Sequence, residues 1–376
     1  MLKRFEVENF RGFAKRLVFD LRVGRYDFNS QVESEGLVKN AILYGPNGSG
    51  KSSLGVALFD IILHITDKDP MPAKTMLPYR NLDNLTKDAS FLYEFQFGSD
   101  RVVYEYAKKE PSELVWEKLS LNGDCLIDYG YFDPVRRFVS KSLVDGLNIE
   151  LVDNKLSVVK YIFRNTPTNK VPIITKLVRF CEKMLWYRSL SDGNMYAGFQ
   201  NGTAQLDEVL YATGKREEFQ AFLQENGVSY ELYFKPVQGK HVLFVRFKDA
   251  DVAFPMVAST GTMALYLFFV WSISAFPQVS LLFIDEFDAF LHYESAAAIV
   301  RRLNEAKTFQ TFLTTHNTSL MNNELTRPDC CFLLSVAEEG EARSNVRIKC
   351  LADSTERELR RVHNLEKMYR NGVFNG

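Results

Sequence analysis

Residues 45–53 read GPNGSGKSS, and this segment is the strongest indication of the fold. It fits the phosphate-loop pattern G-x-x-x-x-G-K-S, whose fixed positions are Gly45, Gly50, Lys51 and Ser52. The apolar run 38–44 (VKNAILY) before it predicts a buried strand, and the largely apolar run 52–65 after it predicts a helix. Strand, glycine loop and helix follow in the order that the motif requires. We therefore expect the chain to bind a nucleoside triphosphate rather than to form a chance glycine-rich turn.

The residue types of this loop suit a phosphate ligand. Glycines let backbone N–H groups curl around the phosphates, and the N-terminus of the following helix adds the positive end of its dipole. Lys51 would neutralise the β- and γ-phosphates, and the Ser52 hydroxyl would ligate Mg²⁺. The cofactors predicted are ATP and Mg²⁺. The predicted nucleotide contacts in the loop are Gly45, Pro46, Asn47, Gly48, Ser49, Gly50, Lys51, Ser52 and Ser53.

Two acidic residues end a second apolar run, 279–288 (VSLLFIDEFD). This is how a magnesium-binding Asp and a water-activating Glu are presented at the tip of a parallel strand. Two acids could also end a strand simply because they face solvent. Beside a phosphate loop we favour the chemical interpretation, in which Asp285 holds Mg²⁺ and Glu286 polarises the attacking water.

A histidine follows a third apolar run, 308–313. The segment TTHN (314–317) places His316 just beyond the end of this predicted strand. A lone histidine is usually structural, but the distance of His316 from the acidic strand is the one expected of a γ-phosphate sensor. We therefore predict Lys51, Glu286 and His316 as the catalytic residues.

The segment 258–262 (ASTGT) opens a long apolar helix predicted over 263–276. Its Ser-x-Gly pattern is a weak signal by itself, but it lies just upstream of the acidic strand. We predict that Ser259, Gly261 and Thr262 contact a nucleotide.

The motifs GPNGSGKSS, STGT, LLFIDEFD and TTHN resemble those of the ABC ATPases, in that family's order. The opening LKRFEVENFRGF is similar to the start of the branch that contains the SMC, RecF and OLD-type proteins. Within this branch the chain resembles stand-alone ATPases of bacterial anti-phage and abortive-infection modules, such as the PtuA and RloA types. Thr262 departs from the usual LSGGQ signature, and the resemblance is weakest over residues 133–226.

The resemblance implies an α/β fold, a P-loop NTPase with an ABC-ATPase head. Such a head has a mostly parallel core sheet, a flanking antiparallel β-subdomain and an inserted helical subdomain. We expect one head over 1–376, with the β-subdomain and P-loop in 1–132, the helical insertion in 133–228, and the signature, acidic-strand and histidine half in 229–376.

The alternation and the helical spacing of apolar residues support this domain organisation. The antiparallel strands are predicted at 3–10, 16–21, 91–97, 101–107 and 115–121, and a hairpin at 229–237 and 241–247. Helical spacing recurs in VVKYIF and IITKLVRFCEKMLWY, and residues 204–226 are a third helical candidate.

Composition limits the possible partners. The 46 basic and 47 acidic residues give a net charge of −1, so no overall field draws the protein to nucleic acid, and direct DNA or RNA binding stays open. The apolar run 263–276, which ends before Pro277, is shorter than the roughly 20 residues that span a bilayer. Five cysteines without metal spacing, and no secretory signal before the first strand, favour a cytoplasmic protein without a membrane partner.

Two absences narrow the expected function. The middle of the chain lacks the long heptad arms of SMC proteins, and the 60 residues after His316 leave no room for the nuclease domain of full OLD proteins. We expect an ATP-hydrolysing switch of a phage-defence system, whose separate effector is a nuclease or toxin. The alternative is a RecF-like repair ATPase that acts directly on DNA.

The resemblance also implies a homodimer, because an ABC-type site is completed by the signature segment of a second head. Four further residues stay open at this stage. Gln96 could contact metal or water, or be an outward strand residue, and Arg11 could approach the nucleotide or lie in a loop. Asp288 and His292 match the loop after the acidic strand, although Asp288 could instead cap a helix.

Overall fold

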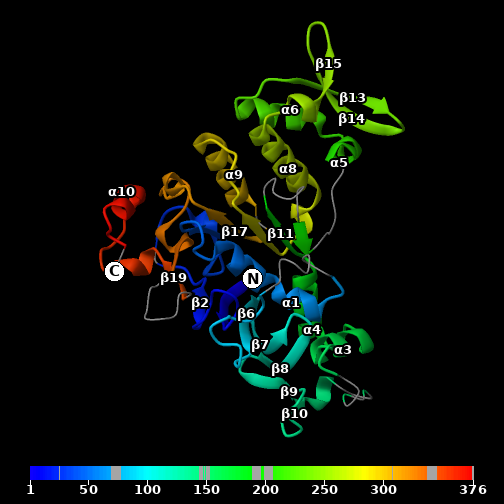
Figure 1. The fold of residues 1–376 in the computed structure, drawn as a ribbon, viewed down its shortest axis with the longest axis vertical. Coiled ribbons are helices and arrows are strands. Elements are labelled where there is room, and N and C mark those ends of the chain that lie inside the picture. Colours follow the sequence, from blue (N-terminus) through cyan, green and yellow to red (C-terminus); the bar gives the residue numbers. More distant parts are fainter. Residues whose placement is uncertain are drawn as a thin grey trace.

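Two seven-stranded sheets organise the molecule, and a three-stranded and a two-stranded sheet accompany them. This computed structural model describes residues 1–24, 26–68, 78–143, 147, 149, 153–188, 196–198, 206–306, 308–336 and 345–374. The core sheet lies in the middle of the long axis, with strands β13–β15 at one end and strands β9 and β10 at the other (Figure 1).

The core sheet has the strand order β12-β11-β16-β17-β5-β18-β19. Its strands are β5 (Asn40–Tyr44), β11 (Met184–Arg188), β12 (Tyr196–Gly198), β16 (Leu281–Asp285), β17 (Gln310–Thr315), β18 (Cys331–Val336) and β19 (Val346–Cys350). The five inner strands are parallel, and β12 and β19 pair antiparallel at the edges. Every residue of β5 and β16 is buried, which explains why both read as continuous apolar runs. The segments that follow β5, β16 and β17 therefore meet at one edge of the sheet.

Helices cover both faces of this sheet. Helix α1 (Lys51–Ile65) follows the glycine loop, as predicted, and α8 (Thr260–Ser274) and α9 (Tyr293–Glu305) flank β16 in the sequence. Along β16, Phe283 belongs to the core that contains α1, whereas Leu282 and Ile284 belong to the core that contains α8 and α9. Successive side chains of β16 point to opposite faces of the sheet, so this one strand contributes to both cores.

The antiparallel sheet has the order β10-β9-β8-β7-β6-β1-β2. Its strands are β1 (Leu2–Glu8), β2 (Leu17–Asp20), β6 (Ala89–Phe97), β7 (Asp100–Glu110), β8 (Glu113–Leu121), β9 (Asp124–Gly130) and β10 (Arg137–Val139). The five predicted strands are confirmed. This sheet packs on α1, where the Tyr93 hydroxyl donates to the Ala57 carbonyl at 2.8 Å. The short strands β3 (Glu33–Ser34) and β4 (Leu37–Val38) pair separately.

The prediction for the middle of the chain is partly wrong. Helices α3 (Val158–Asn165) and α4 (Pro172–Glu182) form where helical spacing predicts them, but MLWY is not a continuation of α4. It is β11, buried beside β16 in the core sheet. A short run that is apolar throughout fits a doubly covered parallel strand as well as a helix, and Trp and Tyr favour the strand. Residues 133–228 therefore do not form one purely helical insertion, and the other domain boundaries stay a prediction.

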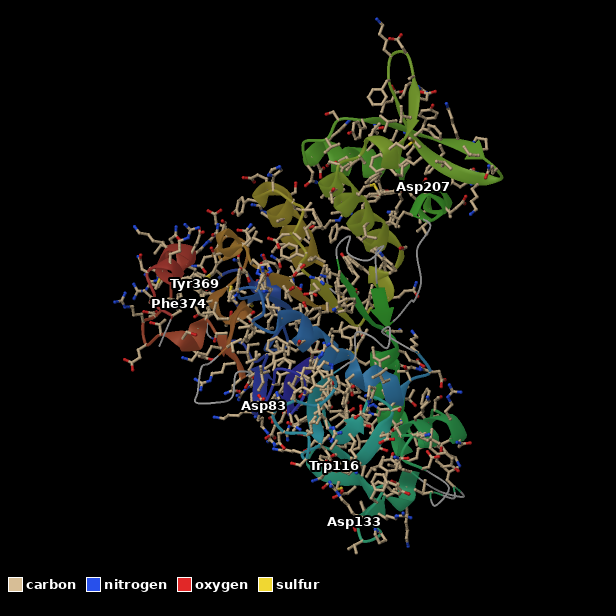
Figure 2. All side chains as sticks on the ribbon, in the orientation of Figure 1. Asp83, Trp116, Asp133, Asp207, Tyr369 and Phe374 are labelled. Carbon is tan, nitrogen blue, oxygen red and sulfur yellow. The ribbon has the colours of Figure 1, made fainter. Side chains whose placement is uncertain are left out.

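A smaller lobe carries the predicted hairpin. Its elements are α5 (Leu206–Thr213), α6 (Arg216–Glu225), β13 (Glu231–Val237), β14 (Lys240–Arg246), β15 (Asp251–Ala253) and α7 (Phe254–Val257). Residues 204 and 205 of the third helical candidate lie outside the described residues. Gln238 and Gly239 have φ values of 51° and 76°, as a tight two-residue hairpin turn requires. Asp207, labelled in Figure 2, accepts from the Tyr266 hydroxyl at 2.7 Å and from Leu243 N at 3.0 Å, so it ties α5 to α8 and β14.

The C-terminal segment ends in α10 (Leu365–Arg370). Tyr369 and Phe374 lie close together there (Figure 2), and Phe374 is buried in the core that contains α8 and α9. Residues 365–374 therefore pack against this core.

Candidate nucleotide-binding site

The glycine loop joins β5 to α1 at the edge where the parallel strands end. Gly48 and Gly50 have φ values of 78° and 92°, which L side chains rarely adopt. A Cβ at Gly45 would lie 2.5 Å from Ser49 Oγ and 2.6 Å from the Leu334 carbonyl oxygen. The sequence pattern is therefore required by the local backbone, and the tip of the loop is exposed to a ligand.

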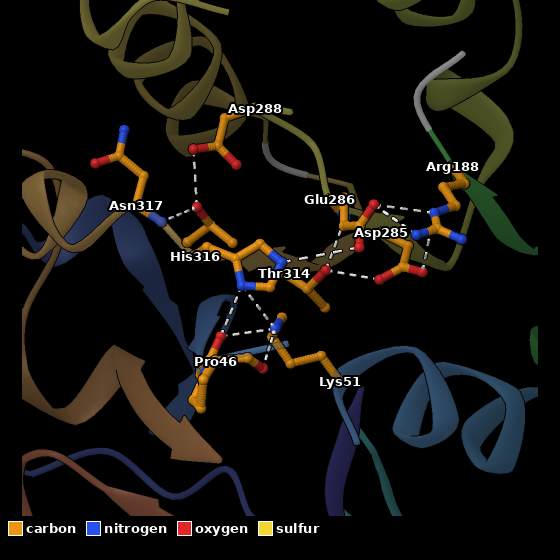
Figure 3. Close-up of polar contacts among 11 residues, drawn as sticks. Pro46, Lys51, Arg188, Asp285, Glu286, Asp288, Thr314, His316 and Asn317 are labelled. Atoms are coloured by element: carbon orange, nitrogen blue, oxygen red, sulfur yellow. Dashed lines mark hydrogen bonds and ion pairs between the residues drawn. The ribbon is translucent and has the colours of Figure 1, made fainter. Parts of the chain in front are cut away.

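Lys51 folds back over the loop. Its Nζ donates to the carbonyls of Gly45 at 2.7 Å and Pro46 at 3.0 Å, and it lies 3.2 Å from His316 Nδ1 (Figure 3). His316 Nδ1 also lies 2.9 Å from the Gly45 carbonyl. Partial burial lowers the pKa of Lys51, and the charges of nearby carboxylates, Asp285 first, oppose that shift. The predicted phosphate lysine and the predicted sensor histidine thus meet at one point.

Asp285 is the last residue of β16 and is fully buried. The Thr314 hydroxyl donates to its Oδ1 at 2.7 Å, while its Oδ2 accepts no hydrogen bond in the described part of the chain. Burial raises the pKa of Asp285, and hydrogen bonds from Ser52 and Thr314 act against the increase. A buried carboxylate oxygen without a donor, beside the Ser52 hydroxyl, is suited to a cation.

A magnesium ion fits this pair of oxygen ligands. Mg²⁺ in phosphate sites is usually held by one or two protein oxygens, with substrate phosphates and water completing its shell. The described residues contain no group of three or more His, Cys, Asp and Glu side chains that could hold a metal ion. Ser52 and Asp285 would hold the ion.

Glu286 has quite different surroundings. Its φ is 49°, an uncommon value for a residue with a side chain, and its N–H donates to Thr314 Oγ1 at 2.7 Å. Arg188 Nη2 donates to Glu286 Oε2 at 2.5 Å, and His316 Nε2 lies 3.8 Å from Oε1. Burial alone would raise the pKa of Glu286, but the hydrogen bond and charge of Arg188 outweigh burial and lower it. Glu286 is thus held as a carboxylate.

Arg188 is the functional candidate that sequence reasoning missed. It ends β11 and pairs in register with Asp285 on β16, and its guanidinium lies beside both acids (Figure 3). The signal was present as an arginine directly after MLWY, but the interpretation of MLWY as helix hid it.

The loop after Glu286 is fixed to the neighbouring strand. Thr315 Oγ1 donates to Asp288 Oδ2 at 2.8 Å and accepts from Asn317 N at 2.9 Å (Figure 3). Asp288 does not cap helix α9, whose N-cap residue is His292. Asp288 therefore orders the segment that carries His316.

The signature segment caps α8. Ser259 Oγ accepts from Thr262 N at 3.1 Å, and a Cβ at Gly261 would lie 2.6 Å from the Phe290 carbonyl oxygen. The close approach of Phe290 explains the glycine. No hydrogen bond between described residues joins 259–262 to the loop 45–53 of the same chain. The structure thus brings together five of the predicted site residues, namely Lys51, Ser52, Asp285, Glu286 and His316. In the described residues, the predicted signature contacts Ser259, Gly261 and Thr262 share no hydrogen bond with the phosphate loop.

Gln96 and Arg11 make hydrogen bonds elsewhere in the chain. Gln96 lies in β6, and its side chain donates to the Gly98 carbonyl at 2.7 Å, which favours the outward strand position. Arg11 has a φ of 49° in the segment after β1, and its N–H donates to Tyr79 O at 3.0 Å. Its approach to a nucleotide stays a prediction.

Comparison with known proteins supports this assembly. Residues 189–322 match the family model described as "AAA domain, putative AbiEii toxin, Type IV TA system". The match covers only part of the chain. The matched stretch contains the signature segment, the paired carboxylates and His316. This match agrees with the predicted resemblance to ATPases, and the predicted α/β P-loop fold class is confirmed.

Solved structures with a similar arrangement are SMC heads. One is the SMC head domain from Thermotoga maritima, with 16% identity, a TM-score of 0.44 and coverage of 93% of this chain and 98% of that one. Another is an SMC head bound to the C-winged helix domain of ScpA, with 15% identity, a TM-score of 0.47 and coverage of 94% and 99%. A third is an SMC head with an extended coiled coil bound to the C-terminal domain of ScpA derived from Pyrococcus furiosus, with 13% identity, a TM-score of 0.44 and coverage of 94% and 97%.

None of the curated proteins compared with this chain matches it significantly. Within the described residues, no helix combines the length and apolar character needed to span a membrane.

Proposed function

We propose that this protein hydrolyses ATP and uses its nucleotide state as a switch that controls a separate effector protein in bacterial phage defence. The observation that carries the proposal is the convergence of Lys51, Asp285, Glu286 and His316 from three strand ends at one edge of the core sheet. Each group faces the place where a triphosphate held by loop 45–53 would end.

The geometry supports a role for each of these residues. Lys51 would exchange the carbonyls of Gly45 and Pro46 for phosphate oxygens, since all of these are acceptors for the same ammonium group. Glu286 would accept a proton from the water that attacks the γ-phosphorus, and His316 would contact the γ-phosphate. Magnesium, when bound at Ser52 and Asp285, would supply positive charge to the phosphate oxygens. ADP is then the leaving group.

Control of an effector is the finer part of the proposal. It is supported by the resemblance to anti-phage ATPases, and the family description links a domain of this kind to a toxin–antitoxin system. The chain has one copy of each nucleotide motif, which supports a homodimer with two shared sites. The expected location is the cytoplasm.

The first test removes the ammonium group of Lys51, which would bind the phosphates. Lys51→Ala should abolish ATP binding because no other side chain of the loop can neutralise the phosphates, and Arg179→Ala on the exposed face of α4 is a matched control. Binding is measured by calorimetry and hydrolysis by phosphate release. Unchanged ATP binding by a folded Lys51→Ala chain would contradict the site.

The second test addresses the output. Cells that carry the gene with its genomic neighbours are challenged with phage, and Lys51→Ala should remove protection that the control variant keeps. Hydrolysis that depends on added DNA, without any protection, would favour the RecF-like alternative instead.

A further inference from the structure

Arg188 reaches Glu286 from the neighbouring strand. Its Nη2 and Nε both donate to Glu286 Oε2, at 2.5 Å and 3.2 Å. Both side chains are about one-third exposed, at 32% and 28%, so the pair lies at the wall of the site rather than in the core. Figure 3 shows the guanidinium on the side of Glu286 away from His316 and Lys51.

The two oxygens of Glu286 therefore face different groups. Arg188 occupies Oε2, while Oε1 is directed to the side where His316 Nε2 lies 3.8 Å away. The backbone of Glu286 is also fixed, because its N–H donates to Thr314 Oγ1. A carboxylate held at one oxygen and at its own backbone has few remaining orientations.

We propose that Arg188 is the positioning residue of Glu286. By holding Oε2, it directs Oε1 toward the water and γ-phosphate side of the site. This inference rests on the proposed function, in which Glu286 accepts the proton of the attacking water. Oriented reacting groups contribute strongly to rate, and misplacement by about 1 Å can reduce it ~100-fold.

A simpler role would be charge neutralisation. Arg188 Nε also lies 3.8 Å from Asp285 Oδ2, so its charge reduces the repulsion between two adjacent carboxylates. A lysine could supply that charge but could not present two N–H groups in a fixed plane. Arg188→Lys therefore separates the two roles.

The experiment compares full-length variants. Arg188→Ala should lower kcat by ~10- to 100-fold and leave the dissociation constant of ATP within ~3-fold, because Arg188 acts after the nucleotide is bound. Arg188→Lys should recover only a small part of the rate. Full recovery by Arg188→Lys, or an unchanged kcat in Arg188→Ala, overturns the proposal.

A double-mutant cycle tests whether Arg188 acts through Glu286. Glu286→Asp keeps a base that is one methylene too short to meet both Arg188 and the water. The Arg188→Ala change should then cost little further rate in the Glu286→Asp chain, whereas an equal fold-loss in both backgrounds overturns the proposal. Arg188→Gln replaces Arg188→Ala if thermal unfolding shows that the alanine variant is not folded.

The proposal and the proposed function can fail separately. An inactive parent chain, or a Glu286→Gln chain as fast as the parent, refutes the proposed role of Glu286 and the inference with it. An active parent whose Glu286→Gln variant is dead, together with a parent-like Arg188→Ala variant, refutes only the inference.

Discussion

Asp285 and Glu286 are neighbours in the sequence, yet the structure gives them opposite electrostatic surroundings. Burial raises the pKa of Asp285, and the charge and hydrogen bond of Arg188 lower that of Glu286. A buried oxygen without a donor is suited to a metal ion, whereas a partly exposed, ionised carboxylate can accept a proton from water. Two adjacent carboxylates can therefore take different roles in one reaction.

This difference predicts a specific phenotype for Glu286→Gln. The amide keeps the shape of the side chain but cannot take the proton, so ATP should bind normally while hydrolysis falls by ~10²-fold or more. Binding is measured with a fluorescent ATP analogue and turnover by phosphate release. If the purified variant hydrolyses ATP at the rate of the parent, Glu286 is not the water-activating residue.

The phosphate-loop helix α1 is joined to the antiparallel sheet by a buried ion pair. Lys108 Nζ donates to Asp60 Oδ2 at 2.8 Å, and both side chains are 0% exposed. The hydroxyls of Tyr79 and Tyr106 donate to the same carboxylate, each at 2.9 Å. Burial lowers the pKa of Lys108, and the charge of Asp60 partly restores it. Asp60 thus balances the charge of Lys108 and accepts hydrogen bonds from two buried hydroxyls that cannot reach water.

Asp60→Ala should therefore destabilise the protein strongly. It leaves Lys108 buried without its counter-charge, a change that typically costs about 3–5 kcal/mol. Urea unfolding followed by circular dichroism measures the loss. The control is Lys176→Ala, which breaks the exposed pair with Asp100 and should cost at most ~1 kcal/mol. Equal losses in the two variants would show that the buried pair does not hold α1 to the sheet.

The sequence predicts secondary structure well where a residue pattern is compatible with only one kind of element. The glycine loop, the alternating strands of the antiparallel sheet and the hairpin at Gln238 and Gly239 are such cases. MLWY could be a helix or a buried strand, and only its contact with β16 decides between them. Because MLWY is interpreted as a helix from the sequence, Arg188 is not predicted to lie beside the paired carboxylates. Asp60 and Lys108 lie 48 positions apart, and neither residue signals its partner within its own element.

In the described residues, the signature segment and the phosphate loop of one chain do not share a hydrogen bond. The N-terminus of α8, capped by Ser259, offers N–H groups suited to an anion. If two chains pair about a two-fold axis, the loop 45–53 of each can meet the Ser259 segment of the other. Nucleotide binding and pairing would then strengthen each other, which gives an effector a state to recognise.

Mixing two inactive variants tests this shared site. Lys51→Ala removes the ammonium group that would bind the phosphates. Ser259→Arg places a large side chain where the signature segment would meet the nucleotide. Each homodimer should therefore be inactive. A mixed dimer should have one working site, built from the loop of the Ser259→Arg chain and the signature of the Lys51→Ala chain. With random pairing, half of the dimers are mixed, so the mixture should regain about one quarter of the parent activity. Ser259→Thr, which keeps a capping hydroxyl, should remain active by itself. The shared site is refuted if the mixture stays inactive while light scattering shows that the two folded variants associate.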